Sequence, residues 1–397
     1  MKFGKWLWLG AVSAMTVAAP LGAQNVEFDG QVRPRYEYRD PAGSGSRDNF
    51  TSMRVRAAIR AMLEENVEVF IQLQDVRLFG EETNTLKDFQ ADNFDLHQGY
   101  VRYRGKRLDW LTTTVGRQEV NFGGQRLVGA VGWTQQGRSF DGVRFDVATG
   151  RTSVGLVGFQ TAEATAPKIS DSAELVGAYA TVRDVGPGAL DLYWLYDRVR
   201  GEADTDQHTY GGRFAWNGTV SGRLEATAQT GTRKGQDLSA YMVGARVGTK
   251  MAGGRVGVTL WYDYLSGDDD LGDGTTKVFS TLYATNHKYY GFADLFLDIP
   301  KHTGGYGLQD LALKTAFKIN DASTLKADFH SFRAAQSNAL PDSRFADEVD
   351  LTLVRRYTSN LSLTSGLSFV FQREAFAAIG RLSEDMTWAY VMLTATF

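Results

Sequence analysis

The last ten residues of the chain, "WAYVMLTATF" (388–397), carry the pattern that decides the fold. From Val391 to Phe397 every second residue is apolar, and Thr394 and Thr396 lie between these positions. An alternation with a period of two residues indicates a β-strand whose two faces meet different surroundings. The pattern runs to the final aromatic residue, and a closed membrane barrel accommodates such an end because its last strand pairs with its first. We therefore expect the chain to close into a membrane barrel.

The amino-terminal residues have the composition of a secretory signal. Lys2 and Lys5 precede the apolar run "WLWLGAVSAMTVAAPLGA" (6–23), which ends in small residues. This arrangement predicts a signal peptide over 1–23, cleaved after Ala23, and one barrel domain over 24–397. No later apolar run reaches the roughly 18 residues that a transmembrane helix needs. If the chain crosses a membrane, we expect it to do so with strands.

Composition argues against several classes of protein. The chain has 397 residues, no cysteine and a formal net charge of −3 at pH 7. Without cysteine there is neither a disulfide nor a thiolate metal site, and the weak negative charge gives no reason to expect a nucleic-acid partner. The 43 glycines and 12% aromatic residues are typical of many strands joined by tight turns. We expect no cofactor.

The alternation recurs along most of the chain. In "TSMRVRAAIRAML" (51–63), apolar residues alternate with Arg54, Arg56 and Arg60. A strand of a soluble sandwich rarely carries so many charges on its polar face, whereas the wet interior of a membrane barrel accepts them. The pattern predicts an all-β fold, a closed transmembrane antiparallel β-barrel of about 18 strands. The expected strands cover 25–39, 50–64, 66–77, 93–105, 109–120, 137–148, 151–160, 172–184, 188–200, 206–217, 219–231, 236–249, 254–265, 306–319, 322–334, 345–357, 360–373 and 383–397.

The connections between these strands alternate in length. The long "DPAGSGSRDN" (40–49) is followed by the tight "EEN" (64–66), and "LFGEETNTLKDFQAD" (78–92) is followed by "GKRL" (105–108). Barrels of the bacterial outer membrane have short periplasmic turns and long external loops. We therefore expect a multi-pass protein of the outer membrane, surrounded by its lipids. An even number of strands would leave both termini in the periplasm.

Charged residues on these strands are expected to face the interior, because an Arg or Lys facing lipid near the midplane costs about 2–4 kcal/mol. A barrel of this size leaves an aqueous channel, and the connections 121–136 and 266–305 are long enough to fold inward and narrow it. Two interpretations stay open: salt bridges with interleaved acids, or unpaired cations that form an anion-selective constriction. The pore-lining candidates from the alternation are Arg35, Arg54, Arg56, Arg102, Arg144, Arg213, Arg246 and Lys314.

Three stretches resemble a known family. They are "VGRQEVNFGGQRLVG" (115–129), "GRSFDGVRF" (137–145) and "TLYATNHKYYGFADLF" (281–296), and together they are similar to the alginate export family of outer-membrane porins. The resemblance implies a monomeric eighteen-stranded barrel with an electropositive channel for an anionic polyuronate. Strand alternation alone leaves the direction of Arg117 open, because Leu111 and Val115 share its face. The residues that the resemblance implies near the constriction are Arg117, Arg126, Arg138, Asp141 and Arg144.

Other motifs carry less weight. In "GDDDLGDG" (267–274), Asp268, Asp270 and Asp273 are a weak calcium candidate, but their spacing does not match an EF-hand, which favours a solvated loop tip. A barrel hydrolase needs a Ser or Thr nucleophile beside a His. His330 is the candidate at an inward position, and a hydrogen bond in the lumen is the favoured interpretation.

These observations predict a channel and not an enzyme. The expected function is passive diffusion of anionic solutes through an arginine-rich pore, with acidic oligosaccharides or polyuronates such as alginate as the expected solutes. One alternative is a general or small-carboxylate porin. A second alternative, from another class, is a barrel enzyme that acts on lipid or polysaccharide.

Overall fold

The computed structural model describes residues 25–41, 47–81, 94–162, 173–200 and 203–397. Eighteen long strands lie in these ranges, and each predicted strand is present with ends within three residues of the expected ones. The predicted signal peptide, 1–23, lies outside the described residues. The strands are β1 (Asn25–Asp40), β2 (Asp48–Glu64), β3 (Val67–Leu78), β4 (Phe94–Arg104), β5 (Leu111–Gln118), β6 (Phe140–Thr149), β7 (Thr152–Ala162), β8 (Ala173–Val185), β9 (Gly188–Val199), β10 (Thr205–Trp216), β11 (Val220–Arg233), β12 (Gln236–Met251), β13 (Val256–Leu265), β15 (Leu308–Asn320), β16 (Ser323–Arg333), β17 (Arg344–Arg356), β18 (Leu361–Gln372) and β19 (Met386–Thr396).

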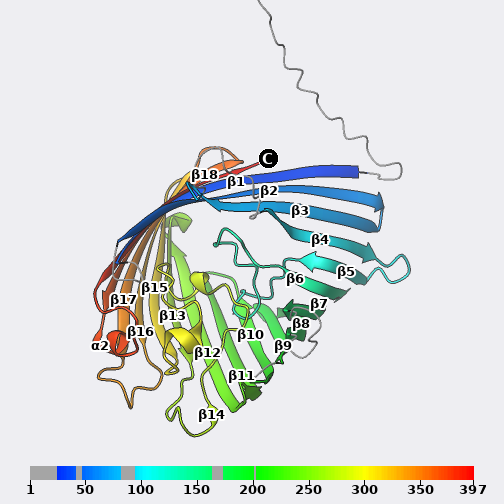
Figure 1. Cartoon of the computed structure of the whole chain (residues 1–397). Helices are drawn as coiled ribbons and strands as arrows, with labels where there is room; N and C mark the ends of the chain where they lie inside the picture. The colour runs from blue at the N-terminus through cyan, green and yellow to red at the C-terminus, as the bar shows by residue number, and fades with distance from the viewer. Residues whose placement is uncertain (1–24, 42–46, 82–93, 163–172, 201–202) are drawn as a thin grey trace, which may run out of the picture.

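These strands form one closed wall. Each strand is antiparallel to its neighbours, and β1 pairs with both β2 and β19, which closes the sheet into a barrel (Figure 1). The two-residue β14 (Thr275–Thr276) lies in a long connection and pairs in parallel with β12, so β13 pairs directly with β15 in the wall. The predicted closed eighteen-stranded antiparallel barrel is confirmed. No helix in the described part of the chain is long and apolar enough to cross a membrane.

Phe397 takes part in the closure of the barrel. Its N–H donates to the carbonyl of Gly30 at 3.1 Å, and the N–H of Gly30 donates to the carbonyl of Phe397 at 2.8 Å. The aromatic ring lies over Gly30, where a Cβ atom would come within 2.1 Å of it. The last residue therefore pairs with β1 through its backbone and covers a bare glycine with its side chain, a cross-strand contact that stabilises sheets.

The two ends of the barrel differ in their connections. Eight turns lie at one end, which we call the short-turn rim, and the longer connections lie at the other, the long-loop rim. The predicted alternation is confirmed, with one exception: only Lys234 and Gly235 join β11 to β12 at the long-loop rim. Both have positive φ, as a tight two-residue hairpin requires. The short turns are 65–66, 105–110, 150–151, 186–187, 217–219, 252–255, 321–322 and 357–360.

The outward face of the wall is apolar. Val101 on β4 and Val115 on β5 are direct partners in register, and their exposed fractions are 48% and 54%. Thr114, one residue along β5, is buried on the inner side. This alternation directs aliphatic and aromatic side chains to lipid and polar side chains to the lumen.

Two long connections, 119–139 and 266–307, build a core inside the barrel (Figure 1). The backbones of Val128 and Tyr283 form a parallel bridge between them. Phe279 and Phe296 are fully buried in one apolar cluster with wall residues such as Trp388. The expectation that 121–136 and 266–305 fold inward is confirmed. Short helices in the long connections are η3 (Asn286–Lys288), α1 (Ile299–His302) and α2 (Glu374–Ala378).

Candidate functional site in the lumen

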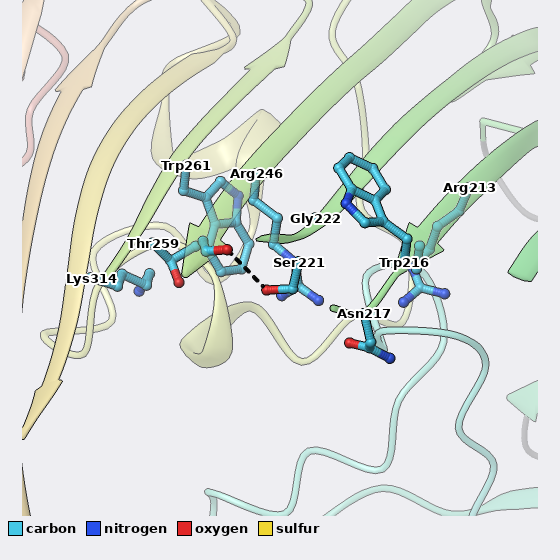
Figure 2. Close-up of a pocket in the computed structure, with 11 residues that line it drawn as sticks. Arg213, Trp216, Asn217, Ser221, Gly222, Arg246, Thr259, Trp261 and Lys314 are labelled. Carbon is cyan, nitrogen blue, oxygen red and sulfur yellow. Dashed lines mark hydrogen bonds between the residues drawn. The ribbon is translucent and has the colours of Figure 1, made fainter. Parts of the chain in front are cut away.

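A cavity of about 290 Å³ lies inside the wall toward the short-turn rim. Its lining includes Arg213 from β10, Arg246 from β12, Trp261 from β13 and Lys314 from β15. Figure 2 shows the two guanidinium groups reaching into this hollow, with the indole ring of Trp261 beside Arg246. Three of the four, Arg213, Arg246 and Lys314, are among the residues that the strand alternation predicts to line the pore.

Two of these cations have acidic partners. The Nη1 atom of Arg213 lies 2.5 Å from Oδ2 of Asp191, its direct partner in register on β9. The Nζ atom of Lys314 lies 3.2 Å from Oδ2 of Asp328 and 3.0 Å from Nε2 of His330. For these positions the salt-bridge interpretation is correct. Their charges are largely offset by the neighbouring strand.

Arg246 has no such compensation, and that of Arg223 is weak. They are direct partners in register on β12 and β11, so two like charges lie opposite each other. Among the described residues, Arg246 forms no hydrogen bond or ion pair, and Arg223 reaches only Glu225, at 3.7 Å, and the hydroxyl of Tyr289, at 3.5 Å. Nε and Nη2 of Arg223 have no hydrogen-bond partner there although the residue is 1% exposed. Opposed like charges and buried unpaired donors are both unfavourable, so this pair is suited to an anion.

Lys288 adds a further cation from the inner core. It is exposed to the lumen although its neighbours His287 and Tyr289 are buried, and its Nζ donates to the carbonyl of Gly124 at 3.3 Å. Partial burial inside the barrel, together with the charges of Arg246, Arg223 and Arg213, lowers the pKa of Lys288. The hydroxyl of the adjacent Tyr289 lies 3.5 Å from Nη1 of Arg223, so Lys288 lies close to the arginine pair. We call Arg213, Arg223, Arg246, Lys288 and Lys314 the lumen cation cluster.

Trp261 supplies an aromatic surface among these cations. Its ring centroid lies 4.9 Å from the guanidinium carbon of Arg223, 5.3 Å from that of Arg246 and 5.3 Å from Nζ of Lys314. The indole N–H donates to Oδ2 of Asp263 at 3.0 Å, which fixes the orientation of the ring. A cation over an aromatic face is attracted to it but keeps its hydrogen-bond donors for other partners.

Arg126, predicted from the family resemblance, anchors the inner core to the wall. Its guanidinium group lies 2.6 Å from Oδ2 of Asp263 and 3.1 Å from Oε2 of Glu225, and it donates to the hydroxyl of Tyr290 at 2.9 Å. Gly244 on β12 is the direct partner in register of both acids, Glu225 on β11 and Asp263 on β13. A Cβ atom at this position would lie 2.4 Å from Asp263 and 3.6 Å from Arg126. A glycine on β12 thus makes room for a loop side chain whose charge is fully paired.

Four wall arginines hold the connection 119–139 in the lumen. We call Arg33, Arg35, Arg54 and Arg56, from β1 and β2, the arginine cradle. Arg35 donates to the carbonyl of Trp133 at 2.8 Å and pairs with Glu37 at 2.8 Å. Arg56 pairs with Glu119 at 3.2 Å, and this ion pair and a hydrogen bond from His97 lower the pKa of Glu119 although burial alone would raise it. Three of the predicted residues, Arg35, Arg54 and Arg56, thus contact a loop inside the barrel.

The other predicted inward cations are also engaged. Arg102 pairs with Glu68 at 3.1 Å, and Arg144 pairs with Asp146 at 2.6 Å. Arg138 donates to the carbonyl oxygens of Gly129 at 3.3 Å and Ala284 at 3.1 Å, and to that of Tyr283. Burial lowers the pKa of Arg138. Arg138 therefore joins the two inward connections.

The placement of Arg117 and Asp141 near the constriction is wrong. Arg117 follows Val115 by two residues on β5, so both lie on the outward face, and its direct partners in register are Gly99 and Asp141. The Arg117 and Asp141 side chains form an ion pair of 2.6 Å, and they are 33% and 57% exposed. The strand period decides their direction. This ion pair faces outward at the end of β5 that lies beside the long-loop rim.

The other candidates are distributed as follows. Asp268 accepts the backbone N–H groups of Asp270 and Lys277, and Asp273 contacts Nζ of Lys277 at 3.4 Å, so these carboxylates do not converge. Among the described residues, no group of three or more His, Asp or Glu side chains is arranged to hold a metal ion. His330 is engaged on both ring nitrogens, by Asp310 at 2.9 Å and by Lys314.

Three site residues, Lys288, Trp261 and Arg223, are not among the predicted pore-lining candidates, and Arg223 is the most instructive of them. It alternates inward like its neighbours, but its importance comes from Arg246 on the next strand. The signal in the sequence that could have identified Arg223 is the register between β11 and β12, which a hairpin joins. The tight turn at Lys234 and Gly235 sets that register, and with it the opposition of the two arginines.

Known proteins resemble this chain over nearly its whole length. The family described as alginate export has a model that matches residues 24–348. A search of curated protein sequences finds no match. Among solved structures, Pseudomonas aeruginosa OccK11 (OpdR) is 12% identical with a TM-score of 0.67, covering 94% of this chain and 96% of that one.

Two further Pseudomonas aeruginosa structures share the fold. The outer membrane protein OprD is 11% identical with a TM-score of 0.66, covering 96% of both chains. OccK2 (OpdF), solved in complex with glucuronate, is 12% identical with a TM-score of 0.63, covering 94% of this chain and 98% of that one. At such identities the likeness shows the fold alone, which is that of an outer-membrane barrel.

Proposed function

The chain belongs to the alginate export family and is an outer-membrane channel, and from this premise we propose that it conducts anionic solutes by way of its lumen cation cluster. The observation that carries the proposal is the opposition of Arg223 and Arg246 without an acidic partner for Arg246 in the described part of the chain. An anion between them relieves the repulsion and uses the free guanidinium donors. Guanidinium groups bind carboxylates in a bidentate geometry.

The proposed solutes are acidic sugars, as uronates or their oligomers. Such a solute has a carboxylate for the arginine pair and C–H faces that pack on an aromatic ring, and Trp261 lies beside Arg246 (Figure 2). The name of the family and the glucuronate held by the fold relative OccK2 support this class. Polyuronates such as alginate are its polymeric members.

The proposal includes an orientation. β1 begins and β19 ends at the short-turn rim, as expected for a chain whose two termini are periplasmic. The cation cluster then lies toward the periplasmic side of the inner core. We propose that residues 1–23 are removed on export and that the mature barrel works as a monomer among outer-membrane lipids.

Selectivity in planar bilayers tests the proposal. Arg223→Gln with Arg246→Gln keeps polarity at both positions and removes the uncompensated charge of Arg246 and the weakly paired charge of Arg223. Wild-type channels in a salt gradient should give a reversal potential of anion preference, and the double variant should move it toward cation preference. The difference should shrink at about 1 M salt, where the screening length falls to about 3 Å.

A matched control uses Arg144→Gln with Arg102→Gln, which removes two cations that have acidic partners. This control should change the reversal potential less. Oligouronates should block the wild-type current more than neutral sugars of equal length. Cation preference in the wild type, or equal block by both sugars, would exclude the anionic channel and leave a general porin. Selective block by small carboxylates alone would favour the small-carboxylate porin.

A further inference from the structure

We infer that Arg33 and Arg54 are positioning residues that hold the connection 119–139 in the lumen and so set the width of the pore. In this assignment their guanidinium geometry matters more than their charge. Selectivity for anions resides in the lumen cation cluster, on other strands. The inference concerns how the constriction is built and holds for any solute.

Arg33 uses its whole guanidinium group on one segment of the loop. Nη1 donates to the carbonyl of Gly132 at 2.7 Å, and Nη2 donates to those of Trp133 at 3.1 Å and Thr134 at 2.7 Å. Nε donates to Oε1 of Gln135 at 3.0 Å. The residue is 5% exposed. Four acceptors of consecutive loop residues thus converge on one side chain.

Arg54 binds the same loop segment from the next strand, β2. Its Nη1 donates to the carbonyls of Thr134 and Gln135, each at 3.3 Å, and its Nε and Nη2 donate to Oε1 of Gln31 on β1. Arg54 is the direct partner of Arg33 in register. The two arginines therefore act on one loop segment from adjacent positions of the wall.

Neither arginine has an acid beside it. In the described ranges no carboxylate oxygen lies within 4.0 Å of the Arg33 or Arg54 guanidinium, whereas Arg35 and Arg56 have Glu37 and Glu119. The contacts of Arg33 and Arg54 with the loop are made to backbone carbonyl oxygens and to the side-chain oxygen of Gln135. A planar fork with five N–H donors suits several carbonyls at once, and the ammonium group of lysine does not reproduce that geometry.

The loop depends on these donors. The carbonyls of Gly132, Trp133 and Thr134 accept no backbone N–H from the described residues. A buried carbonyl without a partner is unfavourable, which is why loops normally run over a surface in water. Without the cradle, water becomes the better partner for these carbonyls, and the segment moves away from the wall.

The segment places the aromatic ring of Trp133 in the lumen. The Trp133 ring lies 4.3 Å from the guanidinium carbon of Arg35 and stacks on His287 at 4.1 Å between ring centroids. It also meets Trp388 and Tyr390 of β19 edge-on. Because His287 belongs to the other inward connection, release of the segment loosens the contact between both connections.

Three double variants separate an effect on the width of the pore from an effect on the charge of its lining. Arg33→Lys with Arg54→Lys keeps both charges, and Arg33→Gln with Arg54→Gln removes them. Arg223→Gln with Arg246→Gln removes two charges elsewhere and is the matched control. Each is compared with the wild type in single-channel conductance, reversal potential, and the largest neutral sugar that enters proteoliposomes in a swelling assay.

Both cradle variants should raise the conductance and admit larger neutral sugars. The lysine variant should do so while its reversal potential stays near that of the wild type. The Arg223 and Arg246 variant should shift the reversal potential without admitting larger sugars. Wild-type conductance and exclusion in the lysine variant would overturn the inference, because charge alone would then suffice. A cradle variant that shifts only the reversal potential would overturn it as well.

A labelling experiment decides the matter if the double variants fail to fold. The natural chain has no cysteine, so Ala130→Cys, at a position 6% exposed in the held loop, is a single reporter. Adding Arg33→Lys alone should speed its modification by a hydrophilic maleimide in folded, heat-modifiable protein. An unchanged rate would contradict the assignment of Arg33 as a positioning residue.

Discussion

Arg213, Arg223 and Arg246 are inward arginines on three successive strands, and they differ in what lies opposite them. Asp191 pairs with Arg213, whereas Arg223 and Arg246 lie opposite each other. A paired charge contributes little to the potential of the lumen, and an unpaired one contributes most of it. The alternation of the sequence placed these residues inside, but only the register between strands separates the paired cations from the unpaired ones.

At this scale we expect a pH dependence that reports on Lys288. Its pKa is lowered by burial and by Arg246, Arg223 and Arg213. A lysine is cationic below its pKa, so Lys288 loses its charge at a lower pH than a free lysine, whose pKa is about 10.4. Raising the pH in the alkaline range below that value should therefore weaken anion preference in the reversal potential.

Lys288→Gln should abolish this response. Lys277 provides the control, because it lies in the same connection but its hydrogen bond to Asp269 raises its pKa. Lys277→Gln should leave the pH response as in the wild type. A response that survives Lys288→Gln would assign the titration to another group.

At the scale of elements, the strands were predictable and the inward connections only in outline. Each strand carries its own period of two, which lipid outside and water inside impose on every membrane-spanning strand. The connections 119–139 and 266–307 have no period, and their shape depends on donors from distant strands, such as Arg33 on β1 and Arg233 on β11. Length alone indicated that they fold inward.

The last strand supports a prediction at this scale. Phe397→Ala removes the ring that covers Gly30 but leaves the backbone pairing of the last residue in place. Cross-strand pairs contribute roughly 0.2–1 kcal/mol to the stability of a sheet. The fraction of protein that folds into lipid vesicles at an intermediate urea concentration should therefore fall modestly. Heat-modifiable gel mobility measures this fraction. Val391→Ala, on the same strand and 48% exposed, is the control, and an equal loss in both variants would deny the terminal ring a special role.

At the scale of the whole molecule, the closed wall gives the barrel two different rims. The long-loop rim bears the exposed tip 269–274, and the short-turn rim bears 217–219. Because the inner core is tied to the wall through Arg126 and the arginine cradle, the inner core and the wall form one structure. The orientation of that structure in the membrane decides which face of the cation cluster a solute meets first.

We expect the long-loop rim to face the outside of the cell. An epitope inserted between Leu271 and Gly272 should bind antibody on intact cells, and one inserted at Gly218 should bind only after the outer membrane is permeabilised. Folded protein is selected in both cases by heat-modifiable mobility. Surface binding at Gly218 but not at 271–272 would reverse the proposed topology.

The sequence by itself determined the class of fold, the position of the strands and the inward direction of most charged residues, because each follows from a local period that lipid and water impose. It did not determine the direction of Arg117 and Asp141, which the family resemblance implied near the constriction while their place on the strand turned them outward. Only the tertiary structure decided which cations lack a partner, since this depends on register, and which arginines serve a loop. Those contacts join residues about 100 positions apart, and no local pattern records them.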